Sequence, residues 1–404
     1  MSDISNNSPS KISSWEILIL LFVLVLATAF RLEDLSTLPY GAWYDEAENT
    51  LVIKRILSEP SYWPLFVADK SQLPALSFYL FAPFVALFPD GVLGVRVGAT
   101  VVGILSILAT WLLARETLGS KIAIFAAFFL AIARWHVNFS RFGMCQIFIT
   151  LTVPLTLYLI CVAWRKKSLT YSSLGGVSAG IALQTYYSSI IIPPLVIALL
   201  ILLKIRDKAS IFLLGKIIAT FLIVTFLTYL PVAFYAWTNW EQFSERFRTV
   251  SGVKLSTAIE LPSLFFSTSP STEVQELALS IKKHILMFNF AGDLNGRHNL
   301  PLAPMLDPIT GSLFVIGLFL ACTRFYKVHN FISLLWFTAF MFTGIFSLTF
   351  EAPQGGRTLG VAPLIAIFAA QAFNLITTTT GRIFYKTPLY NNALIVFLLS
   401  SATF

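Results

Sequence analysis

The chain has 404 residues, of which 56% are hydrophobic and only 12% are Asp, Glu, Lys or Arg. Soluble domains carry roughly 25% of such charged residues, so this composition, with a mean hydropathy of +0.77, excludes a soluble protein and predicts an all-α integral membrane protein. The formal net charge of +8 does not indicate nucleic acid, because Lys and Arg gather in short breaks between apolar runs, as cytoplasmic anchors of spanning helices do. We expect membrane lipids, and no nucleic acid, as partners.

About eleven apolar runs are long enough to cross a bilayer, for which a helix needs about 20 residues. They lie near residues 15–32, 95–115, 121–139, 145–164, 172–186, 189–204, 211–237, 311–325, 331–350, 358–376 and 390–404. The polar tail 1–14 is placed in the cytoplasm, and the first run lacks a small-residue cleavage site, so we predict a retained span and not a signal peptide. Residues 15–404 then form one transmembrane domain. Since the last run is still apolar at Phe404, a later C-terminal domain absent from this chain is a further expectation.

One more apolar run, Leu73 to Pro89, is not counted as a span. It is short and contains Pro74 and Pro83, each of which disturbs helical hydrogen bonding. Without it, and with the N-terminus inside, the later basic loops all fall in the cytoplasm, whereas counting it would place them all outside. The segment is therefore predicted to be interfacial or re-entrant.

With this topology the polar material gathers on the non-cytoplasmic side, in a first outer loop, 33–94, and a long outer loop, 238–310. The first loop is expected to contain interfacial helices. Within the long loop, apolar residues at helical spacing predict a helix lying on the membrane, with Ser271 or Thr272 as its N-cap. Its apolar stripe comprises Val274, Leu277, Ala278, Ile281, Ile285 and Phe288.

The acidic pair Asp45-Glu46 follows the first span closely, where the membrane–water interface is expected. Asp45 could cap a helix that begins at Glu46, with Glu48 completing a capping box. A cap is compatible with catalysis, because the second carboxylate oxygen can face a cleft. For Glu46, a solvated helix start is the alternative to a direct chemical role.

Two arginines lie at outer span ends, where the charge bias disfavours cations: Arg141 after the third span and Arg357 before the tenth. A cation held at a membrane edge commonly has an anionic partner. That partner is either an anionic ligand, a carboxylate such as Asp45 or Glu351, or a lipid headgroup reached by snorkelling.

The segment Arg297-His298-Asn299 is a dense polar cluster just before the eighth span. Its neighbourhood is rich in Gly, Asn and Asp, so a simple turn is the alternative to a site. The four histidines show no metal-ligand spacing, and there is no zinc-protease motif and no phosphate-binding Gly-rich Lys-Ser/Thr loop. The three cysteines lie in apolar runs and predict no disulfide framework.

With these residues the chain resembles the GT-C glycosyltransferases of the protein O-mannosyltransferase and aminoarabinose transferase superfamily. The resemblance covers nearly the whole chain and rests on Asp45-Glu46, Ser140-Arg141, the stretch 297–308 and the segment 357–363. One departure concerns the first loop, where relatives commonly have His-Pro-Pro-Leu or Lys-Pro-Pro-Leu. This chain reads Gln72-Leu73-Pro74-Ala75-Leu76, so the polar residue is missing at Leu73, which affects donor or acceptor identity more than the fold.

The resemblance implies a GT-C-like bundle of about eleven helices that transfers a hexose or pentose, mannose or a similar sugar, from a polyprenyl-phosphate donor. Transfer is inverting, needs no nucleotide sugar and takes place on the non-cytoplasmic face of a cell-envelope membrane. Attack at the anomeric carbon needs a base near the acceptor hydroxyl, for which Asp45 is the first choice and Glu46 the second. The departing phosphate would be held by Arg141, Arg357 or Arg297, because a guanidinium can bind two of its oxygens.

Tyr44, His298, Asn299 and Tyr186 are candidates for lining the donor or acceptor pocket, although aromatic residues also concentrate at bilayer interfaces. The acceptor is a protein, a glycolipid or a polysaccharide. No cofactor is expected. Metal independence is favoured because the pair lacks an Asp-x-Asp arrangement, and a divalent metal is left open. The alternative function is a multi-span transporter or lipid flippase, but a transporter needs ionisable residues at mid-bilayer, and the charges here lie at span ends.

Overall fold

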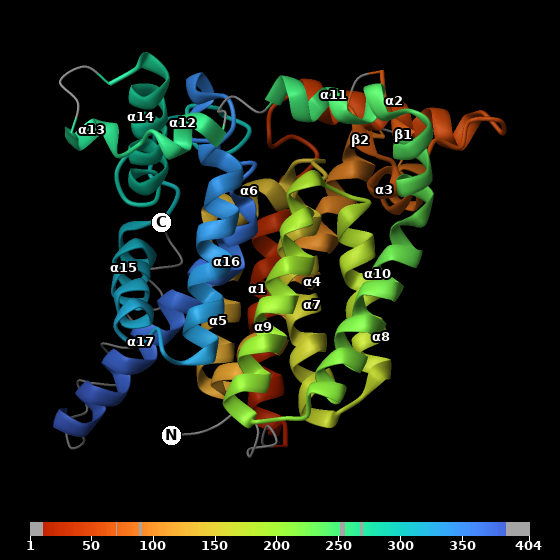
Figure 1. Cartoon of the computed structure of the whole chain (residues 1–404). Coiled ribbons are helices and arrows are strands. Elements are labelled where there is room, and N and C mark those ends of the chain that lie inside the picture. The colour runs from red at the N-terminus through yellow and green to blue at the C-terminus, as the bar shows by residue number, and fades with distance from the viewer. Residues whose placement is uncertain (1–10, 70, 89–90, 251–254, 267–269, 385–404) are drawn as a thin grey trace.

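The computed structural model describes residues 11–69, 71–88, 91–250, 255–266 and 270–384. In this part the chain is a bundle of helices with one small antiparallel sheet (Figure 1). The sheet pairs β1 (Phe66–Val67) with β2 (Leu73–Pro74), so that Phe66 lies opposite Pro74.

Seven helices of the described part are long and apolar enough to span a bilayer. They are α1 (Ser14–Leu32), α4 (Val92–Leu118), α7 (Ile147–Lys166), α9 (Ile192–Asp207) preceded by the 3-10 turn η1 (Tyr187–Ile191), α10 (Ile211–Thr238), α16 (Val328–Ile345), and α17 (Ala362–Phe384) preceded by the 3-10 turn η3 (Leu359–Val361). These correspond to seven of the predicted runs and establish a multi-pass membrane protein. The run predicted at 390–404 lies outside the described residues.

The run predicted as a single span at 121–139 is broken. It forms α5 (Ser120–Ile132) and α6 (Arg134–Arg141), which meet at a bend of 59°. At the bend, Arg31 of α1 donates hydrogen bonds to the carbonyl of Ala131 at 2.9 Å and to that of Leu130 at 3.5 Å. Since the last carbonyls of a helix need partners, a guanidinium from another helix lets α5 end here, and the prediction of one continuous span was wrong.

Three further apolar helices are shorter: α3 (Leu76–Leu87), α8 (Leu169–Leu183) and α15 (Pro308–Thr323). The runs predicted near 172–186 and 311–325 therefore form helices of only 15 and 16 residues, below the usual spanning length. The α3 helix lies within the segment Leu73 to Pro89, which is not predicted to be a span. Its placement at the interface remains a prediction.

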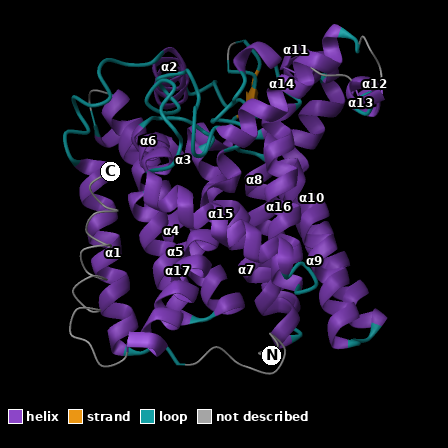
Figure 2. Cartoon of the chain, turned by 90° about the vertical axis from the view of Figure 1, so that its left-hand side faces the viewer, coloured by secondary structure: helices purple, strands orange, loops and turns teal. Residues whose placement is uncertain are grey.

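The remaining helices gather at one end of the bundle, opposite the start of α1 (Figures 1 and 2). They are α2 (Tyr44–Ser58), α11 (Trp240–Val250), α12 (Leu255–Ile259), α13 (Ser263–Phe266), α14 (Thr272–Leu286) and the 3-10 turn η2 (Thr349–Glu351). Residues from both long loops thus share one end, as the topology predicted. That this end is non-cytoplasmic remains a prediction.

The predicted helix of the long loop is α14. Ser271 is its N-cap and accepts a hydrogen bond from the backbone N–H of Val274 at 3.4 Å. Its buried face includes Val274, Leu277 and His284, whereas Ile285, which was predicted in the apolar stripe, is 63% exposed. The position of α14 relative to the membrane remains a prediction.

Candidate active site

The first turn of α2 carries the acidic pair. The helix begins at Tyr44, with Trp43 as N-cap, and Oε2 of Glu46 accepts a hydrogen bond from the backbone N–H of Trp43 at 3.4 Å. Asp45 is therefore already inside the helix, and the predicted cap at Asp45 was wrong by two positions. The reason is that Glu46, as the third helical residue, reaches back to the N-cap as a capping-box side chain does.

Glu46 is completely buried and both of its carboxylate oxygens are occupied. Arg96 of α4 donates from Nε to Oε1 and from Nη2 to Oε2, both at 2.9 Å, and the N–H of Gly143 donates to Oε1 at 3.1 Å. Arg96 also donates to the carbonyls of Leu35 and Gly41. Glu46 is thus a structural anchor for the first outer loop, and the geometry does not favour it as the second candidate base.

Asp45 forms an ion pair with Arg297, which lies 252 residues further along the chain. The contact joins Oδ2 of Asp45 to Nη1 of Arg297, and the side chains are 40% and 21% exposed, respectively. Within the described residues, Oδ1 of Asp45 accepts no hydrogen bond. One carboxylate oxygen is therefore held by a cation while the other is open to an incoming hydroxyl group.

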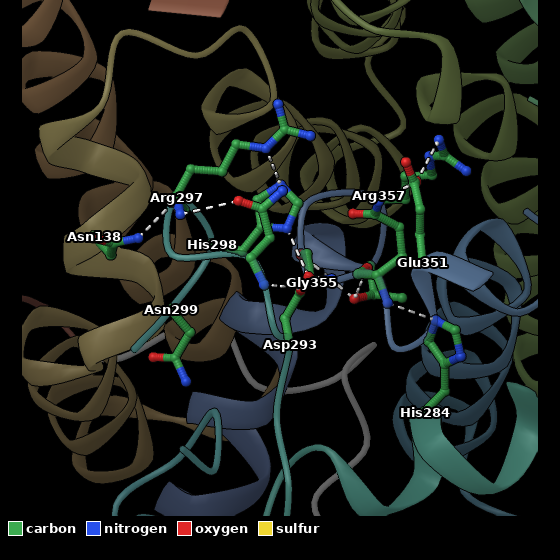
Figure 3. A network of polar contacts seen from close by, with 12 residues as sticks. Asn138, His284, Asp293, Arg297, His298, Asn299, Glu351, Gly355 and Arg357 are labelled. Carbon is green, nitrogen blue, oxygen red and sulfur yellow. Dashed lines mark hydrogen bonds and ion pairs between the residues drawn. The ribbon is translucent and has the colours of Figure 1, made fainter. Parts of the chain in front are cut away.

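Arg297 is itself held by its neighbours in the loop that connects α14 to α15 (Figure 3). Its Nε donates to Nε2 of His298 at 3.1 Å, and Nδ1 of His298 lies 2.6 Å from Oδ2 of Asp293. Asp293 also accepts hydrogen bonds from the backbone N–H groups of Asn295 at 2.8 Å and Gly355 at 2.7 Å. The loop between α14 and α15 and the segment between α16 and α17 are thereby joined at one carboxylate.

The α6 helix supports this loop from the other side. Asn138 donates to the carbonyl of Arg297 at 2.7 Å, Arg134 donates to Oδ1 of Asn299 at 3.2 Å, and the ring of Phe139 stacks on His298 with centroids 5.4 Å apart. The bend between α5 and α6 thus places α6 beneath the site.

Two of the predicted pocket residues, His298 and Asn299, are buried inside this loop. Asn299 is 2% exposed and donates to the carbonyls of Ala303 at 2.8 Å and Pro304 at 3.2 Å. His298 is 1% exposed. Neither side chain lines an open surface, so both support the site without facing a ligand.

A second group of cations forms around Arg357, just before η3. Its Nη2 donates to Oε2 of Glu351 at 3.4 Å, and its Nη1 is buried with no hydrogen-bond partner among the described residues. Burial lowers the pKa of Arg357 below its ordinary value; the charges of Arg246 and Arg297 lower it further, against the opposite effects of Tyr186 and Glu351. Arg357 thus has an unused donor within the electrostatic range of two other arginines, an arrangement suited to an anion.

The outer edge of the site is less enclosed. Tyr44 is 75% exposed, whereas Tyr186 is only 5% exposed and raises the pKa of Arg357 against the effect of burial. Of the four predicted pocket residues, only Tyr44 offers an accessible aromatic face.

Arg141 is not brought into this group. It donates to the carbonyls of Phe30 at 2.8 Å and Leu38 at 3.1 Å. It lines an open pocket of about 380 Å3 that also contains the carboxylates of Glu33 and Asp34. Two nearby carboxylates oppose the binding of a phosphate, so this position favours a structural role for Arg141.

In the part of the chain that the structure describes, no group of three or more His, Cys, Asp or Glu side chains is placed to hold a metal ion. Metal independence remains a prediction.

Three residues of this region were missed in the sequence. Arg96 could have been found, since it too is a cation at a predicted outer span end, the criterion that selected Arg141 and Arg357. Asp293 stands in the turn-rich stretch before Arg297, and nothing in the pattern distinguishes it from a turn residue. Arg246 lies on the amphipathic α11, where a charged residue needs no functional explanation.

Comparison with known proteins assigns the chain to a fold class. Residues 72–232 match the family model described as dolichyl-phosphate-mannose-protein mannosyltransferase. No match was found among curated protein sequences.

Solved structures match over almost the whole chain. The archaeal oligosaccharyltransferase AglB from Archaeoglobus fulgidus, in complex with an inhibitory peptide and a dolichol-phosphate, is 16% identical with a TM-score of 0.63, over 96% of this chain and 54% of that chain. ArnT from Cupriavidus metallidurans, bound to undecaprenyl phosphate, is 15% identical with a TM-score of 0.56, over 89% of this chain and 60% of that chain. The chain therefore spans little more than half the length of these structures.

The architecture is thus that of a multi-pass membrane protein with the GT-C fold. The resemblance expected from the sequence, to GT-C proteins of the protein O-mannosyltransferase and ArnT type, is confirmed.

Proposed function

We propose that this chain is a membrane glycosyltransferase that takes a sugar from a polyprenyl-phosphate donor and passes it to an acceptor hydroxyl on the non-cytoplasmic face. The observation that carries the proposal is the pair formed by Asp45 and Arg297, in which a carboxylate with one open oxygen lies beside a cation at the loop end of a GT-C bundle. The similar structures contain dolichol-phosphate and undecaprenyl phosphate, and we extend that ligand class to this chain.

In this proposal Asp45 is the general base. Its open Oδ1 accepts the proton of the acceptor hydroxyl as the hydroxyl oxygen attacks the anomeric carbon. The bond between that carbon and the phosphate oxygen breaks, and the polyprenyl phosphate leaves with the bonding electrons. A single displacement from the face opposite the phosphate inverts the anomeric configuration, and a positioned base of this kind contributes about 100-fold to 10,000-fold in rate.

The leaving phosphate needs cations fixed before the reaction starts. Arg357 offers a buried Nη1 without a partner among the described residues, and Arg297 and Arg246 add positive charge close to it. We assign the phosphate to Arg357, and Arg297 and Arg246 contribute through their positive charge. Arg141 is not assigned to the phosphate, because it faces Glu33 and Asp34.

Mannose, or a sugar similar to it, is the proposed cargo, on the strength of the family model. The acceptor is a protein, a glycolipid or a polysaccharide, so the test offers a peptide, a glycolipid and a polysaccharide in parallel.

The experiment uses the purified full chain in liposomes with a radiolabelled polyprenyl-phosphate mannose. It measures release of polyprenyl phosphate and label in each acceptor. Wild type should transfer the label to one class of acceptor, and Asp45→Asn should lose that transfer. Asp69→Asn is the matched control, because Asp69 is an exposed carboxylate of the same loop. Equal transfer by wild type and Asp45→Asn would refute the assignment of the base, and failure to bind any polyprenyl-phosphate sugar would refute the enzyme class.

A further inference from the structure

The hydrogen bonds around His298 determine which of its ring nitrogens carries a proton. The Nε of an arginine always carries a hydrogen and can only donate, and here it donates to Nε2 of His298. Nε2 must therefore be an unprotonated acceptor. The ring hydrogen is then on Nδ1, from which it is donated to Oδ2 of Asp293 at 2.6 Å.

Asp293 is suited to fix that arrangement, because an ionised carboxylate accepts hydrogen bonds and donates none. It accepts from Nδ1–H of His298 and from two backbone N–H groups, those of Asn295 and Gly355. The side chains of His298 and Asp293 are only 2% and 4% exposed, so water does not compete for these contacts. The carboxylate therefore holds the imidazole as the neutral tautomer with its hydrogen on Nδ1.

The ring is also fixed on its two faces. Phe139 of α6 stacks on it with an interplanar angle of 14°. The backbone approaches so closely that a Cβ on Gly356 would lie 2.9 Å from Nε2 of His298. The ring cannot turn without displacing α6 or the segment before η3.

We propose that Asp293 and His298 are a positioning pair that orients Arg297 through its Nε–H and, through Nη1 of Arg297, sets the carboxylate of Asp45. Asn138 holds the carbonyl of Arg297 at 2.7 Å, so this residue is fixed at its backbone and at Nε, and only the far end of the guanidinium is free to meet Asp45. The pair rests on the proposed function in one respect: it positions the group to which we assign the base.

The arrangement itself can be tested without turnover. Nitrogen NMR of the protein labelled at histidine and arginine reports which ring nitrogen of His298 is protonated at neutral pH and also observes the Nε–H groups of the arginines. The His298→Gln variant identifies the resonances of the ring. We expect a neutral ring with hydrogen on Nδ1, and an Arg297 Nε–H that exchanges slowly with solvent. A ring protonated on Nε2, or on both nitrogens, would overturn the proposal whether or not the protein is an enzyme.

Turnover then separates positioning from simple packing. His298→Gln keeps an acceptor for Arg297 and a donor for Asp293, whereas His298→Leu keeps bulk but neither hydrogen bond. A misplacement of about 1 Å can lower a rate about 100-fold, so we expect kcat of His298→Leu to fall by 10-fold to 100-fold, approximately, with a smaller change in the donor KM. His298→Gln should recover most of the loss.

Two results would contradict the positioning role: unchanged kcat in His298→Leu, or equal losses in the two variants when both melt at the wild-type temperature. If His298→Leu does not fold, the NMR measurement on the wild type still decides the proposal. If the wild type shows no transfer at all, the proposed function fails, while the ring tautomer and the protection of Arg297 still test the pair.

Discussion

Glu46 of α2 and Arg96 of α4 form a two-point ion pair in which the side chains are 0% and 3% exposed. Consecutive residues of a helix do not share a face, so burying Glu46 turns Asp45 away from the core. The inward residue anchors the helix, and the outward residue is accessible for the role of base that we propose. The division of roles in the acidic pair follows from this contact.

The buried pair leads to a stability prediction. Glu46→Gln or Arg96→Ala leaves a buried group without its partner, which typically costs about 3–5 kcal/mol. Arg55→Ala is the control, because the Arg55–Glu59 pair is about half exposed on both sides, and it should leave stability unchanged. The measurement is unfolding in detergent as the denaturing surfactant is increased; a Glu46→Gln protein as stable as the control would contradict the structural role.

Close helix packing gives a second prediction. A Cβ on Gly317 of α15 would lie 2.0 Å from the carbonyl oxygen of Phe368 in α17. Gly317→Ala must therefore push the two helices apart, and overpacking of this kind costs about 1–3 kcal/mol. A Cβ on Gly215 of α10 would meet no atom within 4 Å. Gly215→Ala should therefore be neutral or slightly stabilising, since Ala favours a helix over Gly by about 1 kcal/mol. Equal melting temperatures of the two variants would contradict the packing of α15 on α17.

The pH dependence of stability provides a third prediction. Burial lowers the pKa of His298 below 6.5, and the neighbouring Asp293 only partly opposes that effect. The unfolded chain therefore binds a proton at His298 more readily than the folded chain does. The folded state keeps its full stability above the pKa that His298 has in the unfolded chain, and it loses stability as the pH falls below that value. When the pH is lowered from about 7.5 to about 5.5, the melting temperature of the wild type should fall further than that of His298→Gln. A parallel loss in the two proteins would contradict a buried neutral ring.

Arg357 allows a test of the proposed phosphate site. Charge-assisted hydrogen bonds contribute about 1.5–3 kcal/mol, so Arg357→Ala should weaken polyprenyl-phosphate binding by about 10-fold or more. Arg248→Ala is the control, because Arg248 is exposed on α11 and, among the residues that the structure describes, donates only to the carbonyl of Glu241. Binding to the protein in lipid nanodiscs measures both; equal affinities would remove Arg357 from the site.

The sequence predicted the spans well where one apolar run forms one helix. The first run, 15–32, corresponds to α1, Ser14–Leu32. The run 121–139 was mispredicted because the bend at Ala133 depends on Arg31, which lies 100 residues earlier than the carbonyl that it caps. A local pattern contains no information about such a partner.

The candidate site was likewise only partly predictable from the sequence. Asp45, Arg297 and Arg357 were selected individually from their positions at span ends, but their pairing could not be predicted, since Asp45 and Arg297 are 252 residues apart. Glu46 was taken as a second base because burial of one member of an acidic pair is not visible in the sequence. Asp293 and Arg246 gain their significance only from neighbours that the fold supplies.

The central claim is that Asp45 acts in the chemical step and not in binding the donor. The most direct measurement compares donor affinity and single-turnover sugar transfer for wild type and Asp45→Asn in the same liposomes. Asp45→Asn should bind the polyprenyl-phosphate sugar within a few-fold of the wild type and transfer it at least about 100-fold more slowly. Transfer by Asp45→Asn at the wild-type rate, or a loss explained entirely by weaker donor binding, would contradict the account.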